Sequence, residues 1–215
     1  MTVGPVPPAH ERSLTSRAIS ATLRHPIVMV LKAPVKNAWW AFKGRGVTNP
    51  PLPSGVTSVL FVCLGNICRS PFAARLAEHR LTDAGIANLQ CASAGISTRQ
   101  SGRTPAHGCA VAEELYGISL VDHRPQLLTA ALIDAFDLVV VMDVGQLTQL
   151  RTSYPHASAR VVLLSLFDPD AVSGYDRVHI DDPFSQSRAV FEACYRRIDR
   201  AVARLLADIA PRHTT

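Results

Sequence analysis

From residue 56 to the end of the chain, strand-like and helix-like segments alternate, and this alternation limits the fold more than any other feature. Short apolar runs rich in β-branched residues are followed by longer segments with apolar residues at every third or fourth position. The runs predict strands at 56–63, 88–94, 138–142 and 160–166. The longer segments predict helices at 71–84, 105–116, 130–136, 145–153 and 188–209. We therefore expect an α/β fold, a flavodoxin-like doubly wound four-stranded parallel sheet with helices on both faces.

Residues 1–55 differ in composition from residues 56–215. The first segment carries seven Lys or Arg and one acid, whereas the remainder carries 15 Arg and 16 acids. A proline-rich stretch, 49–55, separates the two parts and is typical of a linker. We expect a basic N-terminal extension, flexible or docking, over 1–55 and one folded domain over 56–215. Because the domain has no excess positive charge, the sequence gives no support for a nucleic-acid partner.

The role of the extension stays open. Trp39, Trp40 and Phe42, flanked by lysines, suit weak contact with a membrane surface or a partner. A disordered tail, docking on the chain's own domain and a mis-assigned start or transit segment are the alternatives. The longest apolar run in the first sixty residues, 27–31, is too short for a signal or membrane-spanning segment. Five irregularly spaced cysteines suit a reducing compartment, so we expect a cytoplasmic protein.

The strongest chemical signal is the turn after the first predicted strand, Cys63-Leu64-Gly65-Asn66-Ile67-Cys68-Arg69-Ser70. A cysteine at the strand end and an arginine six residues later bracket a loop that must curl tightly. Its N–H groups can form an anion nest, and the positive end of the next helix adds to it. Such a cradle suits a phosphate dianion and also stabilises a thiolate. Arg69 can hold two phosphate oxygens with its planar fork, and Ser70 can donate to the thiolate.

Simpler explanations exist for these residues. A cysteine that ends a strand is usually a small buried apolar residue, and Cys-x5-Arg occurs by chance. The position between a strand and a helix, with Gly, Asn and Ser inside the loop, favours the functional interpretation. A zinc site at Cys63 and Cys68 would need a second ligand pair, and neither the cysteines nor the eight histidines provide one. We expect no metal and no other cofactor.

The segment Val62–Pro71 resembles the signature of the low-molecular-weight protein tyrosine phosphatases. The resemblance extends from about residue 57 to about residue 207. It continues in the right order through Ser93-Ala94-Gly95, His123-Arg124, Leu128-Thr129, Asp137–Asp143, Asp182-Pro183-Phe184 and Phe191-Glu192. The fold of this family is the four-stranded parallel sheet expected above. The resemblance implies a cysteine-dependent phosphomonoester hydrolase, a protein tyrosine phosphatase, acting on a phosphotyrosine-containing protein substrate.

The resemblance also implies a role for each matching residue. Cys63 is the nucleophile that forms a phosphocysteine, and Arg69 binds phosphate. The residues Leu64, Gly65, Asn66, Ile67, Cys68 and Ser70 complete the phosphate-binding loop, with His123 supporting Asn66. Asp182 is the general acid and later the base, although the neighbouring Asp181 remains an alternative. Cys68 matches a residue that can form a reversible disulfide with the nucleophile, its alternative being an ordinary buried cysteine.

Two positions depart from the family pattern. Thr98 or Arg99 stands where an aromatic residue usually forms one wall of the pocket. In the loop that carries Asp182, which we call the acid loop, Phe184 is one aromatic residue of the family pattern. Ser185 stands where a second aromatic often occurs. Arg99 and Phe184 are therefore the candidate pocket residues. An arginine in this place could favour acidic residues beside the target or a substrate with more than one anionic group.

Two other functions fit parts of the pattern. A thioredoxin-coupled arsenate reductase uses a similar loop on the same fold, but it needs two more cysteines close together near the end of the third strand. Met142-Asp143-Val144-Gly145 has none. A non-catalytic phosphopeptide-binding module would be expected to lack the nucleophile or the acid, and this chain has both residue types.

Overall fold

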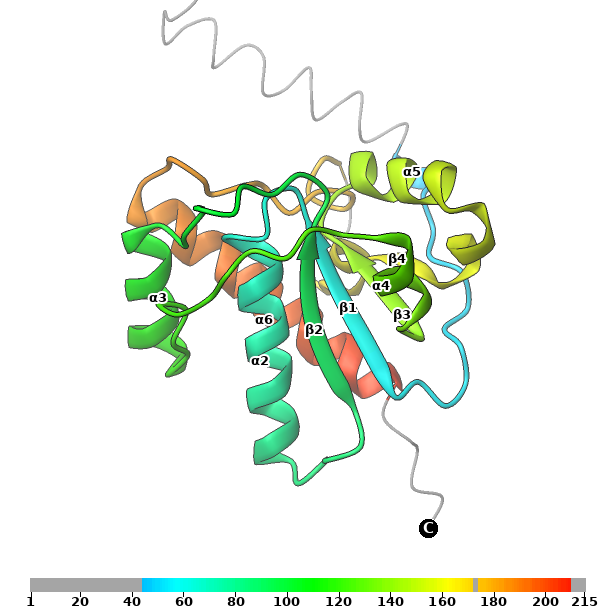
Figure 1. Cartoon of the computed structure of the whole chain (residues 1–215), viewed down its shortest axis with the longest axis horizontal. Coiled ribbons are helices and arrows are strands. Elements are labelled where there is room, and N and C mark those ends of the chain that lie inside the picture. Colours follow the sequence, from blue (N-terminus) through cyan, green and yellow to red (C-terminus); the bar gives the residue numbers. More distant parts are fainter. Residues whose placement is uncertain (1–43, 172–173, 210–215) are drawn as a thin grey trace, which may run out of the picture.

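Residues 44–171 and 174–209 are described by a computed structural model. Four parallel strands form one sheet in the order β2-β1-β3-β4, which confirms the expected fold class (Figure 1). The strands are β1 (Ser58–Cys63), β2 (Gln90–Gly95), β3 (Leu138–Val141) and β4 (Val161–Leu163). The α-helices are α2 (Arg69–Asp83), α3 (Ala106–Tyr116), α4 (Ala130–Asp134), α5 (Val144–Ser153) and α6 (Arg188–Ile209). Short 3-10 helices are η2 (Gly44–Gly46), η3 (Pro155–Arg160) and η4 (Leu164–Phe167).

The central strand β1 is buried along its whole length, and its side chains alternate between two cores. Val59, Phe61 and Cys63 face the core that includes α2, α3 and α6. Leu60 and Val62 face the second core, to which α4 and α5 contribute. A strand covered on both faces is expected to be apolar on both, which explains the continuous run from Val59 to Cys63. Ser58 is buried as well, and its hydroxyl is hydrogen-bonded to Asp137. The alternation also directs the Cys63 side chain towards the α2 side of the sheet.

Local signals set the helix boundaries close to where the sequence predicts them. Gly117 ends α3 in the left-handed conformation with φ 66°, which costs glycine nothing. Thr129 caps α4 by accepting a hydrogen bond from the backbone N–H of Leu132, and Asp143 caps α5 in the same way through Gln146. Helix α2 begins at Arg69, two residues before the start of the helix predicted at 71–84. Arg69 therefore lies in its first turn.

The fourth strand is much shorter than the predicted 160–166. Arg160 is the last residue of η3, where its guanidinium donates to the carbonyl oxygens of Ile133 and Phe136. From Leu164 the chain turns into η4, and Ser165 donates to the carbonyl of Arg177. The apolar run covers both a strand and a buried 3-10 helix, and periodicity alone does not separate the two. The prediction of a seven-residue strand was therefore wrong in length.

The last helix, predicted at 188–209, has those bounds in the structure. Its arginine-rich face does not simply face water, because Arg197 and Arg200 both donate to Asp168, whose side chain is fully buried. Burial opposes ionisation of this carboxyl, but the hydrogen bonds from Arg200 and Arg197 outweigh it and lower the pKa of Asp168. These ion pairs attach the segment after β4 to α6.

Residues 44–49 are bonded to the domain at the edge strand β4 and at Arg177. The Asn49 side chain donates to the carbonyl oxygen of Leu163 (3.1 Å) and accepts from its N–H (2.7 Å), as a neighbouring strand would. Arg177 donates to the carbonyls of Gly44 and Val47. An amide side chain thus satisfies the exposed edge of the sheet. The boundary at residue 55 stays a prediction, and Trp39, with the rest of its cluster, lies outside the described residues.

Within 44–171 and 174–209, no helix combines the length and apolar character that crossing a membrane requires.

Candidate active site

The loop between β1 and α2 encloses the Cys63 side chain. The backbone N–H of Asn66 donates to Cys63 Sγ at 3.2 Å, and Ser70 Oγ lies 3.1 Å from the same sulfur. Asn66 has φ 53°, a left-handed conformation that non-glycine residues rarely adopt and Asn tolerates best. This turn brings the loop N–H groups back towards the sulfur. Two hydrogen-bond donors are therefore aimed at the Cys63 sulfur.

The Asn66 side chain holds the loop from behind. Its Nδ2 donates to Ser70 Oγ and Ser93 Oγ, both at 2.9 Å, and its Oδ1 accepts from the N–H of Gln126 at 2.8 Å. His123 Nε2 lies 2.8 Å from the Asn66 carbonyl oxygen and donates to it. Burial lowers the pKa of His123, with the hydrogen bond to Asn66 opposing it, so the ring is neutral at pH 7. Ser93 was not among the candidate residues, although Ser93-Ala94-Gly95 belongs to the matched segments.

Arg69 is buried and faces three acceptors. Its Nη2 donates to Asp182 Oδ2 at 2.7 Å, and its Nη1 donates to the Ile180 carbonyl at 3.1 Å and lies 3.4 Å from Asp143 Oδ2. Burial alone would lower the pKa of Arg69, but Cys63, Asp182 and Asp143 together raise it, so the guanidinium stays cationic. Its Nε–H is buried and has no partner in the described part of the chain. Such an orphan donor is costly unless a ligand accepts from it.

Asp143 links Arg69 to α5 and is a site residue that the sequence reasoning missed. Its carboxylate accepts from Gln146 Nε2 at 2.6 Å and from the Gln146 N–H at 2.9 Å. Gln146 is itself buried and accepts from the N–H of Met142. Asp143 is the last residue of the matched segment Asp137–Asp143, which was the signal available in the sequence. An aspartate at this position is also typical of an ordinary helix N-cap.

The structure separates the two neighbouring aspartates. Asp182 lines the cavity that contains Cys63, pairs with Arg69 and has a side chain that is 40% exposed. Asp181 accepts a hydrogen bond from the Tyr175 hydroxyl at 2.7 Å. Pro183, directly after them, is buried. Asp182 is therefore the carboxylate that a ligand in this cavity would meet.

This active-site cavity has a volume of about 510 Å³. It is lined by Cys63, Leu64, Gly65, Ile67, Cys68, Ser97, Arg99, Ser101, Gly102, Arg103, Asp182 and Phe184. Of the two candidates for the wall position, Arg99 lines the cavity. Thr98 is packed beneath, where a Cβ added to Gly95 would lie 2.7 Å from its methyl group. Phe184 is 52% exposed and is the aromatic side chain among the lining residues.

The other four cysteines have no comparable surroundings. Burial raises the pKa of Cys91 and of Cys194 to about 12, and it also raises the pKa of Cys68 and Cys109. Cys109 and Cys194 lie within donating distance of backbone carbonyl oxygens, whereas the sulfur of Cys63 accepts hydrogen bonds. All five are free thiols. Only Cys63 therefore combines the cavity with donors aimed at its sulfur.

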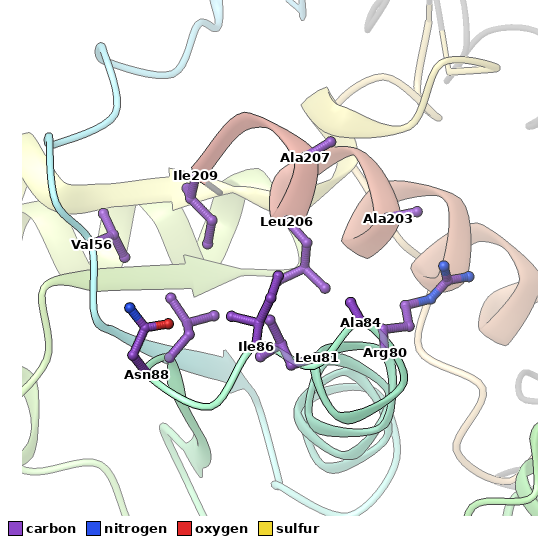
Figure 2. A pocket seen from close by; sticks show the side chains of 11 residues that line it. Val56, Arg80, Leu81, Ala84, Ile86, Asn88, Ala203, Leu206, Ala207 and Ile209 are labelled. Atoms are coloured by element: carbon purple, nitrogen blue, oxygen red, sulfur yellow. The ribbon is translucent and has the colours of Figure 1, made fainter. Parts of the chain in front are cut away.

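A metal has no evident place in the described residues, because no three His, Cys, Asp or Glu side chains among them are grouped to hold one. A second cavity, of about 230 Å³, lies between the end of α2 and the last turns of α6. Figure 2 shows Leu81, Ile86 and Leu206 gathered in it, with Arg80 as the charged lining residue. It contains no nucleophile or acid.

The site combines a cysteine whose sulfur accepts two hydrogen bonds, a buried arginine with a free donor, and a carboxylate at the cavity. Together these groups define a cysteine-based phosphatase. The match to known proteins leads to the same class. The family model of the low molecular weight phosphotyrosine protein phosphatases matches residues 58–214. The chain belongs to this family.

Relatives and solved structures agree with this assignment. A low molecular weight protein-tyrosine-phosphatase of Streptomyces coelicolor is 36% identical over 156 residues, covering 70% of this chain and 92% of that protein. The crystal structure of the Erwinia amylovora tyrosine phosphatase AmsI superposes with a TM-score of 0.63 at 31% identity, covering 72% of this chain and 94% of that one. The YwlE arginine phosphatase of Geobacillus stearothermophilus has a TM-score of 0.61 at 28% identity, covering 70% and 91%. These relatives favour the phosphatase over the arsenate reductase and the binding module.

Proposed function

We propose that this protein hydrolyses phosphotyrosine in protein substrates through a phosphocysteine at Cys63. The observation that carries the proposal is the buried, unpartnered Nε–H of Arg69 beside a sulfur that accepts two hydrogen bonds. A phosphate dianion in the cavity would satisfy that donor and place its phosphorus next to the nucleophile. The five free thiols support a reducing compartment such as the cytoplasm.

The proposed reaction has two steps. The Cys63 thiolate attacks phosphorus, the bond from phosphorus to the tyrosine oxygen breaks, and Asp182 gives its proton to the departing phenolate. Water then attacks the phosphocysteine while Asp182 takes a proton back, and the S–P bond breaks to restore the thiolate. Arg69 and the loop N–H groups from Leu64 to Ser70 neutralise the charge on the phosphoryl oxygens in both steps.

Substrate binding has to rearrange Arg69. Its Nη2 donates to Asp182 Oδ2. A carboxyl group that protonates the leaving group cannot keep this ion pair. A phosphate dianion competes for the guanidinium and releases the carboxyl. The side chains of Asn66, Ser93 and His123 then act as positioning groups, because their hydrogen bonds hold the loop. Ser70 has two roles, since its hydroxyl also donates to the Cys63 sulfur.

Trapping of the intermediate tests the proposal. The full-length protein is mixed with a ³²P-labelled phosphotyrosine peptide in excess EDTA and quenched in denaturant within the first turnover. We expect label on the protein at a base-stable, iodine-labile position in the peptide that contains Cys63. A phosphoarginine peptide is run in parallel because one structural relative is an arginine phosphatase. Label at another residue would contradict the mechanism, and labelling by phosphoarginine alone would contradict the substrate.

We also propose that Cys68 protects the nucleophile against oxidation. Both cysteines line the same cavity and are almost fully buried, five residues apart in one loop. Peroxide would oxidise Cys63 to a sulfenic acid, and the Cys68 thiol would displace water from it to give a disulfide. We expect activity to return on adding a dithiol in the wild type and much less in Cys68→Ser. Equal recovery in the two proteins would show that Cys68 is only a buried core residue.

A further inference from the structure

The loop 96–103, which follows β2, forms one wall of the active-site cavity and is bonded directly to the Cys63–Ser70 loop. The N–H of Ile96 donates to the Cys63 carbonyl at 3.0 Å, and the N–H of Ser97 donates to the Leu64 carbonyl at 2.8 Å. Gly102 packs so closely that an added Cβ would lie 3.1 Å from the Ile67 side chain. The backbone of this wall therefore has a fixed place relative to the nucleophile.

Two exposed arginines project from this wall. A turn in which the Gly102 N–H donates to the Arg99 carbonyl at 2.8 Å separates Arg99 from Arg103. Both line the active-site cavity. Within the described residues Arg99 has no hydrogen bond or ion pair, and Arg103 bonds only to the carbonyl of its neighbour Gly102. By contrast, Arg188 and Arg200 elsewhere in the domain are paired with carboxylates.

Nothing among the residues lining the cavity neutralises these two charges. Asp182 is the one acid there, and it pairs with Arg69. The helix α3 begins at Ala106, three residues after Arg103, with no acid in its first turn and no side chain bonded to its first N–H groups. Its positive end adds to the same side of the site. We call Arg99, Arg103 and the start of α3 the cationic rim.

On the basis of the proposed function, we propose that the cationic rim selects phosphotyrosines that have a second anionic group within one or two residues. With the phosphate seated against Cys63, the neighbouring residues of a peptide lie at the cavity mouth, where the rim is. A guanidinium binds a carboxylate or a phosphate with two parallel hydrogen bonds. Phe184, half-exposed among the lining residues, is available to contact the aromatic ring. The cationic rim thus discriminates between substrates by the residues that flank the phosphotyrosine.

Peptide kinetics on the full-length protein tests the rim. Three phosphotyrosine peptides of equal length are compared: one with Asp and Glu beside the phosphotyrosine, one with Asn and Gln instead, and one with a second phosphotyrosine. Exposed ion pairs are individually weak, so we expect kcat/KM to favour the acidic peptide over the neutral one by about tenfold at low salt. The preference should shrink in 0.5 M NaCl, because salt screens exposed charges. A preference confined to the doubly phosphorylated peptide supports the rim with phosphate as its second anion.

The variants separate the rim from general charge. In Arg99→Gln/Arg103→Gln the ratio of kcat/KM between acidic and neutral peptides should fall to about one. The matched control, Arg196→Gln/Arg204→Gln, removes the same charge from the exposed face of α6 and should keep the wild-type ratio. A wild-type ratio near one against both anionic peptides, or an equal fall in both variants, would overturn the rim proposal while leaving the phosphatase activity intact. Failure to hydrolyse any phosphotyrosine peptide would overturn the proposed function as well.

Discussion

Replacing Cys63 with serine is expected to lower phosphotyrosine peptide turnover by about 10⁴-fold or more, as removing a nucleophile does in other enzymes. A serine hydroxyl at this position has no base among its contacts to deprotonate it, because Asn66 and Ser70 both act as donors to this position. The matched control is Cys68→Ser, a serine in the same loop, which should retain turnover under reducing conditions. Steady-state kinetics in excess EDTA measures both. Full activity in Cys63→Ser would contradict the assignment of the nucleophile.

Arg69 tests the same site through phosphate binding. Arg69→Lys keeps the positive charge but loses the planar fork and the Nε–H that has no partner. We expect a loss in kcat/KM of about 10²-fold or more, the usual range for removing a donor to a developing oxyanion. Because the side chain is buried, thermal unfolding of the variant is measured alongside. A folded Arg69→Lys protein with wild-type kinetics would show that the guanidinium does not bind the phosphoryl group.

Replacing Asp182 with alanine is expected to lower kcat by about 10²- to 10⁴-fold, the contribution of a general acid. The loss should be smaller for aryl phosphates whose leaving groups are stable without a proton, and kcat across a series of phenols measures this. Asp181→Ala is the matched control, because that carboxylate lies next in the chain but accepts from Tyr175.

The two aspartates can exchange roles only if the acid loop moves. If kcat fell in Asp181→Ala and stayed at the wild-type value in Asp182→Ala, the acid loop would have to rearrange on substrate binding. Equal leaving-group dependence in the wild type and in Asp182→Ala would contradict acid catalysis by Asp182.

Much of this architecture could be predicted from the sequence, because it depends on local patterns. Apolar runs with no polar alternation indicate doubly covered strands, and Gly117 and Thr129 mark helix ends through backbone and capping preferences. The spacing of Cys63 and Arg69, in the turn that joins a strand to a helix, indicates an anion-binding loop. This signal is local as well. Those signals lie within a few residues of what they determine.

The tertiary structure alone decided which distant residues complete the site. Ser93 meets Asn66 across 27 positions, and Asp143 meets Arg69 across 74. No local pattern encodes such a meeting, because it depends on the order in which the strands pair. The same applies to Asn49, which completes the edge of β4 across 114 positions. Arg103 is a similar case. The sequence shows that the residue is charged, but only the packing of Gly102 on Ile67 places that charge at the cavity beside Cys63.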